Sequence, residues 1–176
     1  AFGKSGTNAQ KFFEAICSDV LRQNSAHAHL GVHNVAALVW GAAKSQYVGN
    51  DLYNHAGKVL KQECQSYKNK HYPAIWEPSH ISTLLTGFAR ARYYGKGLSN
   101  SSWEAAAKLI ETRNYFKNNI FCVRLIHAFG SVGHVNEEVL QKAVDSIDAT
   151  KLNSQALANL VWGLAKLEMY DKEVFA

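Results

Sequence analysis

The chain has 176 residues, 47% of them hydrophobic, and a formal net charge of +5. This length can bury one sizeable core, and no run of eighteen apolar residues offers a candidate for a transmembrane helix. Because proline is excluded from helix interiors, the presence of only two prolines favours an all-helical protein.

Apolar residues at helical spacing predict a first helix over residues 10–23. A ten-residue phrase then recurs along the chain, as VAALVWGAAK at 35–44, ISTLLTGFAR at 81–90, CVRLIHAFGS at 122–131 and LANLVWGLAK at 157–166. Each copy places apolar residues at i, i+3, i+4 and i+7, which is the pattern of a core-facing helix. We therefore expect helices near residues 34–46, 80–92, 121–131 and 156–167.

A second helix is expected after each of these. The candidates span residues 51–65, 102–114 and 136–147, with Ser101 or Ser102 and Asn136 as N-caps, and one more begins near residue 171. We interpret the 10–23 helix as the second helix of a preceding pair. Because the chain ends inside an expected helix, we expect residues 1–176 to form a single helical-repeat domain of a longer protein.

Small residues align at one column of the phrase: Gly41, Gly87, Ala128 and Gly163, at intervals of 46, 41 and 35 residues. Glycine inside a helix costs about 1 kcal/mol relative to alanine, so its recurrence predicts close contact between neighbouring helices. Self-similarity at this spacing is typical of stacked helix pairs. The sequence therefore predicts an all-α protein, a right-handed α-solenoid of about four and a half helix-pair repeats.

The phrase LANLVWGLAKL at 157–167 resembles the signature of octotricopeptide repeats, and equally that of the related heptatricopeptide repeats, many of which precede a RAP domain. Residues 35–44 match it well, and 81–90 and 122–131 match it more weakly. The resemblance implies an α-solenoid that binds organellar RNA. Thr86 and His127 replace the family's Trp, the spacing is irregular, and no RAP domain lies within the chain, which argues against a code of one base per repeat.

Positive charge is concentrated in the middle of the chain. Residues 58–124 carry eleven Lys and Arg against four Asp and Glu, whereas residues 125–176 carry four against seven. A basic segment indicates an anionic partner, most often nucleic acid, so the acidic last third is expected to face protein or solvent.

Basic residues interleaved with aromatic residues suit phosphate contact and base stacking. Ordinary solvated surface is the alternative interpretation of such residues. The candidate RNA-binding residues are Lys44, Lys58, Lys61, Lys68, Lys70, Tyr72, Arg90, Arg92, Tyr94, Lys96, Arg113, Lys117 and Arg124.

On the first helix of each pair, three columns of residues lie opposite the core stripe. They hold Ala37, Thr83, Arg124 and Asn159; then Trp40, Thr86, His127 and Trp162; then Lys44, Arg90, Ser131 and Lys166. Such columns suit contacts with bases and phosphates. For Trp40 and Trp162 we favour packing between neighbouring helices over contact with RNA.

No catalytic residue, cofactor or metal site is expected, because carboxylates are few and scattered. His27, His29 and His33 have no nearby cysteine or carboxylate to complete a metal site. The three cysteines lie far apart, in neither a disulfide framework nor a zinc spacing, and we interpret them as buried thiols in a reducing compartment.

These observations predict a non-catalytic RNA-binding protein of an organelle, with no membrane partner. The mitochondrion is the first choice and the plastid the second. We expect ribosomal RNA as the ligand, and neighbouring ribosomal or ribonucleoprotein subunits as partners of a ribosome component or assembly factor. Two alternatives stay open: a protein-binding scaffold of similar fold, and the RNA-binding module of an RNA-processing enzyme.

Overall fold

The computed structural model describes residues 9–22, 31–47, 49–66, 76–95 and 97–169. All regular structure within these ranges is helical, which confirms the predicted all-α class. The α-helices are α1 (Ala9–Arg22), α2 (Val32–Lys44), α3 (Asn50–Ser66), α4 (Pro78–Arg90), α5 (Leu98–Arg113), α6 (Asn119–Val132), α7 (Glu137–Asp145) and α8 (Ser154–Lys166). Short 3-10 turns, η3 (Tyr115–Lys117) and η4 (Ala149–Lys151), precede α6 and α8.

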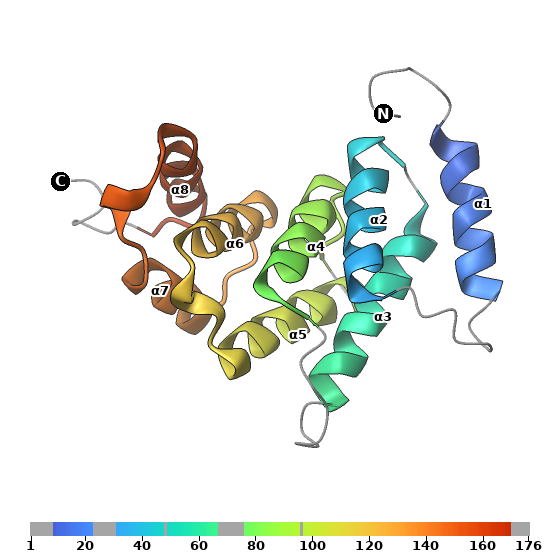
Figure 1. The fold of residues 1–176 in the computed structure, drawn as a ribbon, viewed down its shortest axis with the longest axis horizontal. Helices are drawn as coiled ribbons and strands as arrows, with labels where there is room; N and C mark the ends of the chain where they lie inside the picture. Colours follow the sequence, from blue (N-terminus) through green and yellow to red (C-terminus); the bar gives the residue numbers. More distant parts are fainter. Residues whose placement is uncertain (1–8, 23–30, 48, 67–75, 96, 170–176) are drawn as a thin grey trace.

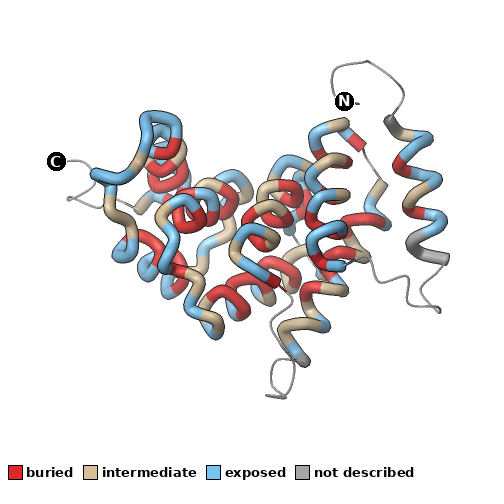
Figure 2. Tube along the Cα trace, in the orientation of Figure 1, coloured by how far each residue is buried: buried red, intermediate tan, exposed pale blue. Residues whose placement is uncertain are grey.

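The helices form two layers. Helices α2, α4, α6 and α8, which carry the recurring phrase, pack side by side in chain order and make up the layer we call the A layer. Helices α3, α5 and α7 form the B layer, and α1 contacts α3. The two layers follow an arc, with the A helices on its inner side and the B helices on its outer side (Figure 1). Most buried residues lie where the helices face one another (Figure 2).

The predicted core stripe is buried in α4 and α6. Ile81, Leu84, Leu85 and Phe88 are fully buried, and so are the four corresponding residues of α6. Leu157 of α8 is an exception, since 40% of it is exposed. Among the described helices α8 packs mainly against α6, so part of its apolar stripe has no covering partner within the described chain.

The aligned glycines behave differently from one another. A Cβ atom on Gly87 would lie 2.8 Å from Val39 Cγ1, and one on Gly163 would lie 2.9 Å from Ile126 Cγ2. These contacts confirm the predicted close approach at the α2–α4 and α6–α8 crossings. The prediction is wrong for Gly41, whose nearest such neighbour is Phe13 Cζ at 3.9 Å. Gly41 faces the tip of a side chain on α1 rather than the backbone of another A helix.

All four A helices end in the same way. The N–H of Tyr47 donates to the carbonyl of Ala42 (3.0 Å) and the N–H of Gln46 to that of Ala43 (3.2 Å), which is a Schellman motif. The same pair of bonds closes α4, α6 and α8. The left-handed residue of the motif is Gln46, Arg92, Gly133 or Glu168 in turn. The motif is therefore a second repeated feature of the chain, and its last residues lie beyond the end of the recurring ten-residue phrase in α2, α4, α6 and α8.

The second helices of the pairs differ in detail from their predicted bounds. Asn136 caps α7 as predicted, since its side chain accepts from the N–H of Val139. Helix α5 begins at Leu98 instead of Ser102 and has Gly97 as its N-cap residue, so Ser101 and Ser102 lie inside the helix, where their hydroxyls donate to the Leu98 carbonyl. The helix expected near residue 171 lies outside the described residues.

The free cysteines follow their predicted interpretation only in part. Cys17 and Cys122 are buried, whereas Cys64 is partly exposed. Burial raises the pKa of Cys122 to about 11, which keeps this thiol protonated at neutral pH.

Candidate nucleic-acid interface

Charge is sorted between the two layers. The four A helices contain no Asp or Glu, and each carries one Lys or Arg: Lys44, Arg90, Arg124 and Lys166. Every carboxylate within a described α-helix belongs to α1, α3, α5 or α7. The nearest flanking carboxylates are Glu77, which caps α4, and Glu168, which follows α8. The A layer is therefore a positive surface within a chain of mixed charge.

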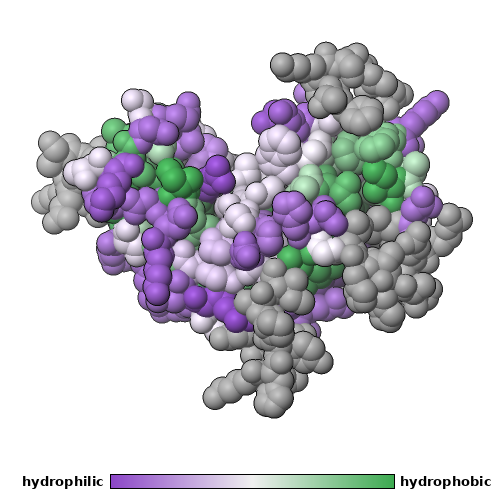
Figure 3. Space-filling view, viewed as in Figure 1, coloured by the Kyte–Doolittle hydropathy of each residue, from purple (hydrophilic) through white to green (hydrophobic). Residues whose placement is uncertain are grey.

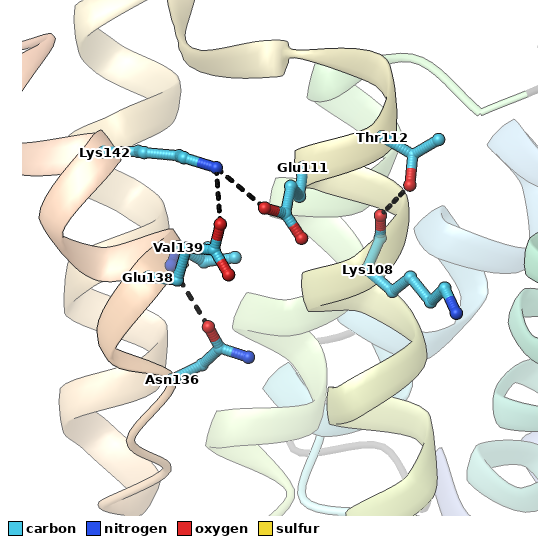
Figure 4. Close-up of polar contacts among 7 residues, drawn as sticks. All are labelled: Lys108, Glu111, Thr112, Asn136, Glu138, Val139 and Lys142. Carbon is cyan, nitrogen blue, oxygen red and sulfur yellow. Dashed lines mark hydrogen bonds and ion pairs between the residues drawn. The ribbon is translucent and has the colours of Figure 1, made fainter.

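The carboxylates of the B layer are engaged in part with that layer's own cations. The Lys142 Nζ on α7 lies 2.7 Å from a carboxylate oxygen of Glu111 on α5 and 2.8 Å from one of Glu138 (Figure 4). The Glu111 contact joins two helices of the B layer. Glu138, which belongs to the acidic last third of the chain, is therefore paired with a lysine of the protein itself.

A groove of about 520 Å³ lies on the A layer. Its lining comes only from A helices and includes all four of them. The lining residues are Trp40, Ser82, Thr83, Thr86, Arg124, His127 and Asn159. In the space-filling view the molecule is hollowed between the α8 side and the α2 side (Figure 3).

The polar atoms of the groove divide into acceptors and donors. The Ser82 hydroxyl donates to the Ser79 carbonyl (3.1 Å), and the Thr86 hydroxyl donates to the Ser82 carbonyl (2.7 Å). Because each proton is engaged within α4, these hydroxyls offer lone pairs to the groove. Asn159 accepts from Gln155 Nε2 at 3.1 Å, which leaves its own N–H groups to donate.

Arg124 contributes the groove's positive charge. Its side chain is exposed on α6, and it forms no ion pair with any described residue. A guanidinium has five N–H donors in a fixed plane that suits a phosphate. Beside it, burial lowers the pKa of His127 below its ordinary value of 6.5, so this imidazole is neutral at pH 7.

Two tryptophans stand on the A layer with much of each ring in solvent. Trp40 is 40% exposed and Trp162 is 41% exposed. A lysine one turn later lies over each ring, with Lys44 Nζ 4.8 Å from the Trp40 centroid and Lys166 Nζ 5.9 Å from that of Trp162.

Our interpretation of these tryptophans as packing residues is correct only in part. The Trp162 ring packs against the His127 imidazole of α6, with centroids 4.8 Å apart. The backbone of Trp40 lies next to Gly87, where α2 and α4 cross, while Trp40 itself also lines the groove. The backbone, rather than the indole, provides the close helix contact there.

The sequence-predicted RNA-binding residues do not form one site. Lys44, Arg90 and Arg124 lie on A helices, and of these three only Arg124 lines the groove. Arg90 and Arg92 line a shallow pocket of about 340 Å³ at the ends of α2 and α4. Tyr94 is exposed and borders a different pocket, which it shares with Arg92.

The remaining predicted residues lie elsewhere. Lys58 and Lys61 belong to α3, where Lys61 Nζ donates to Ser101 Oγ at 3.1 Å. Arg113 ends α5 and Lys117 lies in η3. None of these four lines the groove. The other candidates, Lys68, Lys70, Tyr72 and Lys96, lie outside the described residues.

Several aromatic residues near these candidates are structural. Tyr93 and Trp76 are buried. The Trp103 indole donates to the Tyr93 carbonyl at 2.8 Å, and the Tyr115 hydroxyl donates to the Trp76 carbonyl. Their place in basic stretches of sequence therefore does not make them stacking residues.

The groove includes residues that the candidate set missed. Thr83, Thr86, His127 and Asn159 lie in the outer columns of the helical projection, but the distribution of charge along the chain does not distinguish them, because none of the four carries a fixed charge. Summing charge helix by helix would have identified their face. Ser82 had no such signal, since it lies beside the core stripe and is 2% exposed.

Comparisons with known protein families, curated proteins and solved structures found no match to this chain. None of the described helices is long and apolar enough to cross a membrane. The described residues include no cluster of three His, Cys, Asp or Glu side chains placed to bind a metal ion. Of the three histidines considered for a metal site, His27 and His29 lie outside the described residues, and His33 packs against His80. The function is therefore inferred from the chemistry of the groove.

Proposed function

We propose that this protein is a non-catalytic RNA-binding helical-repeat protein, a right-handed α-solenoid that binds RNA along its A layer. The observation that carries the proposal is the sorting of charge, which leaves the A helices with one cation each and no carboxylate. A polyanion is attracted to such a surface more than to the B helices, where carboxylates offset the cations.

The groove supports RNA over other polyanions. Arg124 suits phosphate, and exposed aromatic rings suit the faces of unpaired bases. The hydroxyl acceptors of α4 and the donors of Arg124 and Asn159 suit the edges of bases and the ribose 2′-hydroxyl. The groove holds one imidazole and no carboxylate, which favours binding over acid–base catalysis.

The resemblance to octotricopeptide and heptatricopeptide repeats supports the cellular part of the proposal. It favours a mitochondrial protein, with the plastid as second choice. There the protein binds ribosomal RNA, as a ribosome component or assembly factor beside other ribonucleoprotein subunits. Crosslinking in cells, followed by sequencing of the bound RNA, tests this part.

A salt titration with matched variants tests the proposed binding surface. One variant replaces Lys44, Arg124 and Lys166 on the A layer by Gln. The other replaces Lys58, Lys108 and Lys117, which lie outside the groove, and loses the same charge. For single-stranded RNA, log affinity falls with log salt by about 0.7 per phosphate neutralised, so the A-layer variant should flatten the slope by about two units.

The matched variant keeps the wild-type slope if the A layer is the binding surface. A larger effect from the variant at Lys58, Lys108 and Lys117 would place the RNA on the outer side of the arc. No measurable RNA binding by the wild-type protein would contradict the proposed function.

A protein partner is the second candidate. Ile120, Val135 and Leu157 are exposed apolar side chains, at 39%, 56% and 40%, at the start of α6, beyond its end and on α8, and each of them is open to contact with a protein partner. This candidate predicts that replacing these three residues by Ser abolishes capture of a partner protein and leaves RNA binding unchanged.

A further inference from the structure

Trp40 and Trp162 occupy the same column of the repeat, near the two ends of the A layer. Trp40 lines the groove. Trp162 adjoins it through His127, which lines the groove and packs against the Trp162 ring. Helix α6, which carries Arg124, lies between the two tryptophan-bearing helices in the order of the layer.

A stacked base can replace the lysine that lies over each indole, because the two contacts differ in strength. A cation over an exposed aromatic ring contributes about two- to fivefold in an equilibrium constant. A base stacked on an aromatic side chain contributes about five- to 150-fold in affinity. A base therefore displaces the lysine, and the freed ammonium stays within reach of the neighbouring phosphate.

The groove's size favours single strands. Its volume of about 520 Å³ lies within the range of pockets that enclose one small ligand. A duplex is far larger than this and hides the faces of its bases by stacking them on one another. Only an unpaired, unstacked base can present its face to an indole.

We propose that Trp40 and Trp162 are stacking platforms for unpaired nucleobases of single-stranded RNA, with Arg124 holding phosphate between them. This inference rests on the proposed RNA-binding function and adds the strand state of the ligand and the residues that select it.

Quenching of intrinsic fluorescence by a bound base reports these two residues selectively, because a base can contact only exposed indoles. The chain has four tryptophans, and the other two, Trp76 and Trp103, are 1% and 0% exposed. Bases stacked on Trp40 and Trp162 should quench their emission, whereas a polyanion without bases should not. The probes are a single-stranded RNA of about twelve nucleotides, the duplex it forms with its complement, and inorganic polyphosphate.

We expect the single strand to bind and to quench the fluorescence. The duplex should bind about tenfold more weakly and should not quench it. Polyphosphate should bind without quenching. Trp40→Phe and Trp162→Phe should each bind more weakly than the wild type and more tightly than the corresponding Leu variant, since a smaller ring remains, and each should remove part of the quenching. Trp40→Leu should weaken single-strand binding about tenfold. Phe12→Leu is the matched control, because Phe12 is also exposed (41%) but lies on α1.

Single-strand binding without quenching, or equal affinity for the duplex, would overturn the inference and leave the proposed function standing. Equal losses for Trp40→Leu and Phe12→Leu would do the same. Failure of the wild-type protein to bind either form of RNA would overturn the proposed function itself, so the two failures are distinguishable. A melting temperature for each variant identifies any that lose affinity by unfolding.

Discussion

Gly41, Gly87 and Gly163 share one column of the repeat but meet different neighbours. At Gly163 an added methyl group would lie 2.9 Å from Ile126 Cγ2 and 3.1 Å from the backbone of His127. Backbone cannot move aside as the end of a flexible side chain can. At Gly41 the nearest atom, 3.9 Å away, is in ordinary van der Waals contact. The same residue type is therefore required at one position and only tolerated at the other.

We predict that Gly87→Ala and Gly163→Ala each lower the free energy of unfolding by about 1–3 kcal/mol, because the added methyl overpacks a helix crossing. Gly41→Ala is the control and should raise it by up to about 1 kcal/mol, since alanine is the better helix former. Urea denaturation of the three variants measures these changes. Destabilisation by Gly41→Ala equal to that by Gly163→Ala would contradict the prediction.

The ends of the A helices illustrate how an element constrains its sequence. Each helix ends with a left-handed residue and a backbone bond that reaches back to the last turn. The following residue, Tyr47 after α2 and Tyr93 after α4, is buried. Only α6 uses glycine at the left-handed position, whereas Gln46, Arg92 and Glu168 adopt it with a side chain.

We predict that Gln46→Gly and Glu168→Gly each stabilise the protein by about 0.5–1 kcal/mol. Glycine avoids the steric cost of the left-handed conformation. The net gain is smaller than that cost, because glycine loses more conformational entropy on folding than other residues do. Gly133→Ala should destabilise by about 1 kcal/mol, because it introduces that cost. Thermal denaturation of the three variants tests the sign of each effect, and a lower melting temperature for both Gln46→Gly and Glu168→Gly would refute the argument.

At the scale of the whole molecule, alternation between two layers decides where charge lies. Successive helices along the chain fall in opposite layers, so any long stretch of sequence contributes to both. The acidic last third includes α8, which supplies Asn159 and Lys166 to the A layer, and α7, which carries Glu137 and Glu138 in the B layer. Averaging charge over that stretch mixes two surfaces of opposite character.

The stability of the whole fold depends on pH through three partly buried histidines. These are His55 in α3, His127 in α6 and His134 after α6. The pKa values of His55, His127 and His134 lie below the ordinary 6.5, chiefly because burial disfavours the imidazolium. Lys58 adds to the effect at His55, and Glu104 opposes it at His134. Between the folded and unfolded pKa values the unfolded chain binds more protons than the folded chain.

We therefore predict that stability is fully present above about pH 6.5 and falls as the pH is lowered toward 5. Urea midpoints at pH 7.5, 6.5 and 5.5 measure this loss. A variant with Gln at all three histidines should show a flatter profile over the same range. A midpoint that stays constant or rises on acidification would show that these imidazoles are not held neutral by the fold.

The sequence by itself determined the helical class, the four recurring helices and most of the core stripe. These depend on periodicity and composition, which are local properties of the chain. It also placed Thr83, Thr86, Arg124, His127 and Asn159 opposite that stripe, because the angle between residues on a helix is constant.

Only the tertiary structure decided which of these residues meet. It joined side chains of four helices in one groove, placed Lys58 and Arg113 outside it, buried Tyr93, and left Trp40 and Trp162 partly exposed to solvent. The physical reason is that burial and contact depend on which helices become neighbours. That choice follows from the packing of the two layers, and no single stretch of sequence contains it.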